Sequence, residues 1–160
     1  MQNKFALLLL ASSLSLPLVA CTTDDGSSSS TASIDPAPLS GTVGGQAWTF
    51  QAGHTDSFLS KDEPDFFASL FPTTFSTCGF SEPSGDHLIL SIPKTVGDYP
   101  MSLSRNMTFV VGNDNKIAID GHIEVTEVTA TSVKGGIVAK FDDQNEVNGT
   151  FTIPVCPDDN

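Results

Sequence analysis

Basic side chains are scarce in this sequence. Seven Lys and Arg residues face 19 Asp and Glu residues, which gives a formal net charge of −12 at pH 7. A surface with this charge repels phosphate groups, so we expect no nucleic-acid partner. The same charge favours solubility and attracts cations or basic partners.

The sequence also lacks the short motifs of common cofactor sites. It has no glycine-rich phosphate loop, no dinucleotide fingerprint and no internal repeat, so we expect no cofactor. The three histidines, His54, His87 and His122, lie in separate segments without the spacing of a metal site. A scattered histidine is more often an ordinary surface or strand residue.

One short stretch has the residue types of a hydrolase. Ser84, Asp86 and His87 occur within four positions. The sequence has no G-x-S-x-G motif, however, and adjacency in sequence does not place a base against a nucleophile. We therefore expect a protein that is not an enzyme. A small hydrolase-like envelope enzyme with a site near His87 is the alternative.

Only one long apolar run is present, and it lies at the N-terminus. Residues 5–20 follow a short flank with Lys4 and are interrupted by serines and Pro17. Such a segment is too short and too interrupted to span a bilayer stably, but it is typical of a secretory signal. Residues 1–20 are therefore predicted to be a signal peptide. Its removal leaves six basic residues against 19 acidic ones, a net charge of −13.

The end of this run, Leu18-Val19-Ala20-Cys21, resembles the lipobox of bacterial lipoproteins. The resemblance implies that diacylglycerol is added to the Cys21 thiol, that the chain is cut before Cys21, and that the new terminus is acylated. Several acyl chains, palmitate among them, would hold the protein firmly on a membrane. Thr22 stands where an Asp would favour the inner membrane, so the resemblance favours the outer membrane. An ordinary secretory signal is the alternative.

Cysteine is rare, with three residues in the chain. Lipidation of Cys21 would leave Cys78 and Cys156 in a compartment that permits disulfides, and one pairing is then possible. Such a bridge closes a loop of about 79 residues and stabilises the fold by about 4–5 kcal/mol in the chain-entropy model. Two free thiols are the alternative, and a zinc site lacks nearby histidines.

The mature chain divides by composition into a tether, a domain and a tail. Residues 21–38 are polar, rich in serine and closed by two prolines, so they are predicted to form a disordered tether with a reach of about 20–25 Å. Residues 39–157 carry the apolar pattern of a folded domain. Residues 158–160 form a short tail.

The domain is predicted to be all-β, an antiparallel sandwich or barrel-like meander of about seven to nine short strands, because apolar residues alternate with polar ones between turns. Gly44 and Gly45 predict a tight hairpin turn. Residues 54–65 are expected to be a loop, and a strand is favoured over a short capped helix for residues 66–71. The alternation also places Phe141 on the same side as Ile137 and Ala139. The residues expected to be buried are Trp48, Leu90, Phe109, Ile119, Ile137, Phe151 and Ile153.

The two ends of the domain carry a second resemblance. The opening GTVGGQAWTF and the ending GGIVAKFDDQNEVNGTFTIPVC are similar to uncharacterised all-β domains of Gram-negative envelope lipoproteins. These motifs concern folding, and no catalytic residue follows from them. The resulting expectation is a binding or structural module that meets an envelope protein or an extracellular ligand.

Oxygen-bearing side chains crowd one predicted turn. Asp142, Asp143, Asn145 and Glu146 are weak candidates for a calcium site, with residues 113–115 as a second source of oxygens. The order of residues differs from that of an EF-hand loop, and Asp and Asn are favoured in turns for backbone reasons. A plain solvated turn without a metal is therefore expected.

Overall fold

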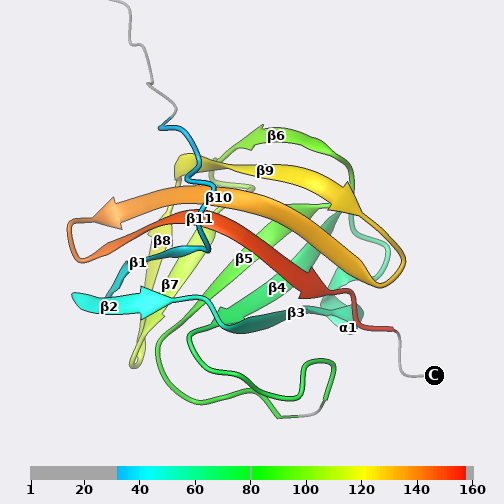
Figure 1. Ribbon diagram of the computed structural model, residues 1–160, viewed down its shortest axis with the longest axis horizontal. Coiled ribbons are helices and arrows are strands. Elements are labelled where there is room, and N and C mark those ends of the chain that lie inside the picture. Colours follow the sequence, from blue (N-terminus) through cyan, green and yellow to red (C-terminus); the bar gives the residue numbers. More distant parts are fainter. Residues whose placement is uncertain (1–31, 80, 158–160) are drawn as a thin grey trace, which may run out of the picture.

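A computed structural model describes residues 32–79 and 81–157 of the chain (Figure 1). Within these ranges the chain forms eleven strands and one short helix. In chain order they are β1 (Ser40–Val43), β2 (Gln46–Thr49), β3 (Ala52–Asp56), α1 (Ser57–Ser60), β4 (Asp65–Phe71), β5 (His87–Pro93), β6 (Gly97–Pro100), β7 (Met107–Val111), β8 (Asp114–Ala118), β9 (Asp120–Val128), β10 (Ser132–Asp142) and β11 (Asn145–Pro154).

The strands form two antiparallel sheets that pack face to face, so the all-β fold is confirmed. The six-stranded sheet has the order β2-β1-β11-β10-β9-β6, and the five-stranded sheet has the order β3-β4-β5-β7-β8. The two sheets remain separate, as in a sandwich, and do not close into a barrel. The number of strands is larger than the seven to nine expected, because β3 and β6 are short segments with weak sequence patterns.

The core lies between the sheets and consists of one cluster of apolar side chains. Alternation places Leu88, Leu90 and Ile92 of β5 in this core, while their neighbours in the strand point away. Six of the seven residues predicted to be buried are buried, namely Trp48, Leu90, Phe109, Ile137, Phe151 and Ile153.

The prediction for Ile119 is wrong, because its side chain is 48% exposed. In the pairing of β7 with β8, Met107 lies opposite Ala118 and Thr108 lies opposite Ile117. Residues opposite each other in an antiparallel pair share a face, so Ala118 points inward with Met107 and Ile117 points outward. Ile119 follows in the crossing from β8 to β9 and is also outside.

The prediction that Phe141 shares the inward side of Ile137 and Ala139 is also wrong. Ile137 and Ala139 are buried, whereas Phe141 is 47% exposed. The register between β10 and β11 shifts between Lys140 and Asp142. The side chain of an extra residue in one strand does not follow the regular inward and outward alternation, and here the extra residue is Phe141.

Residues 54–65 are not the loop that was expected. They include most of β3 and the single-turn helix α1, whose N-cap is Asp56. The Asp56 carboxylate accepts a hydrogen bond from the Leu59 backbone N–H at 2.7 Å, so the helix begins after Asp56 and ends at Ser60. The strand predicted for residues 66–71 is confirmed as β4, which pairs with β3 and β5.

The hairpin turn between β1 and β2 is confirmed. Gly44 and Gly45 both have positive φ angles, 59° and 73°, which a two-residue turn of this kind requires and which glycine adopts without strain. The Gly44 N–H donates to the Asn145 side-chain oxygen at 2.9 Å. This bond ties the β1–β2 turn to the turn between β10 and β11.

Part of the segment expected to be a tether contacts the domain. We call residues Ser33–Pro38 the strap, because they form hydrogen bonds with β11 and because Ile34 lies against Gly136 of β10. The Asp35 N–H donates to the Asn148 side chain at 2.8 Å, and the Asn148 amide donates to the Ser33 carbonyl at 3.1 Å. The Thr150 N–H donates to the Ala37 carbonyl at 2.8 Å. The contacts with β11 therefore begin six residues before Leu39, the predicted start of the domain.

Candidate functional site

The hydrolase-like cluster near His87 is not assembled as a catalytic triad. The Asp86 carboxylate accepts a hydrogen bond from the Gly112 N–H at 2.9 Å and so supports the turn between β7 and β8. The His87 Nδ1 donates to the Gly85 carbonyl at 2.8 Å, and the ring stacks on Phe71 at 4.8 Å. Among the described residues, no hydrogen bond joins the His87 ring to Ser84 or Asp86.

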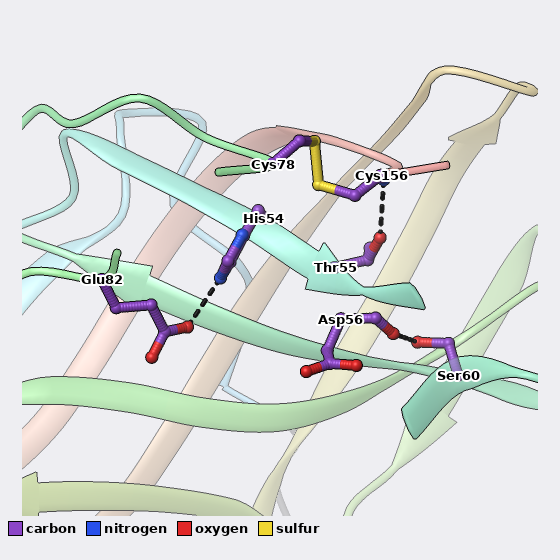
Figure 2. The surroundings of a disulfide bond; sticks show 7 residues. All are labelled: His54, Thr55, Asp56, Ser60, Cys78, Glu82 and Cys156. Carbon is purple, nitrogen blue, oxygen red and sulfur yellow. Dashed lines mark hydrogen bonds and ion pairs between the residues drawn. A yellow bond between two sulfur atoms is a disulfide. The ribbon is translucent and has the colours of Figure 1, made fainter. Parts of the chain in front are cut away.

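The predicted disulfide between Cys78 and Cys156 is present (Figure 2). Cys78 lies in the segment from Pro72 to Asp86, which connects β4 to β5, and Cys156 follows β11. The Cα atoms of the two cysteines are 5.1 Å apart, and the Cys156 N–H donates to the Thr55 hydroxyl at 3.0 Å. The bridge therefore holds the connecting segment beside β3 and the end of β11.

The connecting segment is also held by a buried histidine that sequence analysis did not single out. His54 Nε2 lies 2.6 Å from the Glu82 carboxylate (Figure 2). The His54 side chain is 10% exposed and that of Glu82 is 47% exposed. Phe75 packs edge-on against both the His54 ring, at 5.5 Å, and the Phe71 ring, at 5.1 Å. The segment thus covers the outer face of β3 and β4.

The His54–Glu82 pair resembles the histidine and the carboxylate of a catalytic triad, but the described residues do not add a nucleophile to it. Ser69 lies opposite His54 in the β3–β4 register, so both side chains are on the same face. Ser69 is buried, and in the described part of the chain no hydrogen bond joins its hydroxyl to the His54 ring. The arrangement therefore fits a role in holding the connecting segment.

The acidic turn at residues 142–146 uses its oxygens within the protein. Asp142 accepts hydrogen bonds from the Gln144 N–H at 2.9 Å and the Asn145 amide at 2.8 Å. Lys140 contacts Asp143 at 2.7 Å and Glu146 at 3.1 Å. The hydrogen bond that the Lys140 ammonium donates to Asp143, followed by the one that it donates to Glu146, raises the pKa of Lys140, and the hydrogen bond to Asp143 lowers the pKa of Asp143.

The contacts of the four calcium candidates are thus those of a turn. In residues 32–79 and 81–157, no group of three or more His, Cys, Asp or Glu side chains is arranged to hold a metal ion. Asn145, one of the four candidates, is buried, and its side-chain oxygen accepts a hydrogen bond from the Gly44 N–H.

A groove of about 670 Å³ lies on the outer face of the six-stranded sheet. Its lining includes Ala32, just before the strap, together with Pro100 and Ile119. Its polar lining comes from Ser40, Asp120, Lys140, Glu146 and Asn148. A second hollow of about 430 Å³ shares Ile119, Asp120 and Lys140 with it and extends to Ile117 and Phe141. We call the two hollows together the sheet groove.

Sequence analysis did not predict the sheet groove. Its residues come from β1, β6, β8, β9, β10 and β11 and from the chain before the strap, and they are brought together only by the strand order. The sequence contained one signal for such a surface site, because the apolar residues Ile119 and Phe141 stand beside charged residues. Alternation assigned both residues to the core.

The comparisons with known proteins do not identify the chain. No protein-family model, no curated protein and no solved structure matches it. Cys21 and the predicted signal peptide lie outside the described residues. Within the part of the chain that the structure describes, no helix is long and apolar enough to cross a membrane.

Proposed function

We propose that this protein is a lipid-anchored lipoprotein of the bacterial envelope and that its all-β domain binds a partner through the sheet groove. The observation that carries the binding role is the groove itself, which is open, partly apolar and formed on the six-stranded sheet. The resemblance of residues 18–21 to a lipobox supports the anchor, and the disulfide fits a compartment that permits such bonds.

Only a short stretch of chain separates the proposed anchor from the groove. Ala32 lines the groove, and only residues 22–31 separate it from Cys21. A chain of this length spans at most about 36–40 Å even when it is fully extended. The groove would therefore lie close to the membrane surface, and its partner would be found in the adjacent layer of the envelope. Thr22 favours the outer membrane as the site of the anchor.

The binding role is preferred to the alternative of a small hydrolase. The Asp86 carboxylate accepts a hydrogen bond from the Gly112 N–H in the β7–β8 turn, and the His87 Nδ1 atom donates to the Gly85 carbonyl two residues before it. No observation in the described residues places a nucleophile against either of them.

Replacing Cys21 with alanine should abolish labelling of the protein by palmitate and release it from the membrane fraction, because the thiol that carries the lipid is lost. Metabolic labelling and cell fractionation measure the two effects. A matched variant with Cys78 and Cys156 replaced by serine should keep the label. Undiminished labelling of the Cys21 variant would show that the anchor is elsewhere or absent.

A photo-crosslinking residue at position 119 should capture one defined partner on intact cells, because Ile119 lines both hollows of the groove. The same residue placed at the exposed position 73, in the connecting segment on the other sheet, serves as the control. Mass spectrometry of the adducts identifies what is bound. The same adducts at both positions, or none at position 119, would contradict a binding role for the groove.

A further inference from the structure

The geometry points to a basic, amphipathic segment of a partner polypeptide as the occupant of the sheet groove. Its apolar side chains would pack on Ile117, Ile119 and Phe141, and its Lys or Arg side chains would lie beside Asp120 and Glu146. This inference rests on the proposed binding role and adds the chemistry of the partner.

The apolar part of the groove arises where large apolar residues take outward positions on or beside the strands. Ile117, Ile119 and Phe141 are 52%, 48% and 47% exposed. The register of β8 turns Ile117 outward, and the irregularity in β10 does the same for Phe141. β8 and β10 belong to different sheets but contact each other (Figure 1).

Two separate departures from the pattern thus place large apolar side chains at one spot on the surface. Exposed apolar side chains that gather in one hollow usually mark an interaction site, whereas single ones are normal on any surface. Departures from local sequence rules are also expected at functional sites. Leu103, by comparison, is 83% exposed but lines neither hollow.

The charged part of the groove favours a cationic occupant. Asp120 and Glu146 line it, and Asp143 lies beside it. Lys140 is the one cationic side chain that lines the described groove, and Asp143 and Glu146 hold it at 2.7 and 3.1 Å. Its charge is therefore offset locally. The net charge of the whole chain, −12, would also steer a basic partner toward the surface and repel an acidic one.

The binding of a model peptide to the full chain tests this inference. The protein is taken from membranes and placed in discs of phosphatidylcholine, a lipid without net charge. The probes are labelled peptides of about seven residues, a length on the scale of strand-like recognition segments. One peptide alternates Lys with Leu, one alternates Glu with Leu, and one alternates Lys with Ser. Fluorescence anisotropy gives the Kd of each.

We expect the Lys–Leu peptide to bind at least about tenfold more tightly than either of the others, because both the apolar and the charged contacts are needed. Replacing Ile119 and Phe141 with serine should weaken its binding about tenfold, and Leu103→Ser should not. Asp120→Asn with Glu146→Gln should weaken binding most at low salt, whereas Glu63→Gln, at an exposed acid away from the groove, should have little effect.

Three results would overturn the inference: equal binding of the Glu–Leu peptide, equal losses at Leu103 and at the groove, or binding that occurs only after residues 22–31 are removed. The last result would show that the chain's own N-terminal segment occupies the groove. If position 119 captures a partner on cells but the Lys–Leu peptide does not bind, the binding role stands and the basic class is wrong. Failure of both experiments removes the binding role as well.

Discussion

Replacing Phe151 with alanine should lower the free energy of unfolding by about 3–5 kcal/mol, the range measured when a large buried aromatic side chain is truncated. Phe151 is 4% exposed and lies on β11, which pairs with β1 on one side and β10 on the other. Its ring lies over Gly135, the residue opposite it on β10, since a Cβ added at Gly135 would be 3.1 Å from the ring. The ring therefore occupies space that a side chain at position 135 would otherwise take.

Urea unfolding of the mature chain measures this loss. Thr152→Ala is the matched control, because Thr152 is the next residue on the same strand and is exposed on the opposite face. It should change the free energy of unfolding by no more than about 0.5 kcal/mol. A loss below about 1 kcal/mol for Phe151→Ala would mean that the ring does not belong to the core.

Strands with one face on the core could be predicted from the sequence. In β5, β7 and β11 most inward positions are apolar and most outward positions are polar, because one face meets the opposite sheet while the other meets solvent or a loop. The hairpin at Gly44 and Gly45 was predictable for a different reason, since consecutive glycines accept positive φ angles.

β3 could not be recognised in the same way, because both of its faces are covered. Gly53, His54 and Thr55 are all buried, so the strand shows no alternation. The core covers Gly53 and Thr55, whereas Phe75 and Glu82 of the connecting segment cover His54. The cover on the outer face depends on a residue 28 positions away in the sequence. A local pattern carries no information on such a contact.

The sheet groove illustrates a second limit of the pattern. Ile119 and Phe141 have the residue types of core positions, and only the register of β8 and the irregularity in β10 turn them outward. Register depends on how neighbouring strands pair, so it is a property of the sheet rather than of either segment. The predicted core was therefore correct for six residues, Trp48 of the edge strand β2 among them, and the pattern was wrong between β8 and β9 and at the irregularity in β10.

Replacing both Cys78 and Cys156 with serine should destabilise the domain by about 4–5 kcal/mol in the chain-entropy model, which is close to the upper end of measured values for native disulfides. The two cysteines are 78 positions apart, so the bond restricts a large part of the unfolded chain. It also connects the segment from Pro72 to Asp86, which has no strand of its own, with the end of β11. Loss of the bond leaves the His54–Glu82 contact and the packing of Phe75 to hold that segment.

Urea unfolding with and without a phosphine reductant measures the effect. The reduced wild-type protein should lose the same stability as the double serine variant, and the variant itself should not respond to the reductant. Hydrogen exchange in the native state should speed up for residues 73–86 and for β3, where the covering contacts weaken. If reduction changes the free energy of unfolding by less than about 1 kcal/mol, the unfolded chain is not restricted as the model requires. Faster exchange confined to residues 73–86 would then mean that the bond holds only the connecting segment and that the two sheets are stable without it.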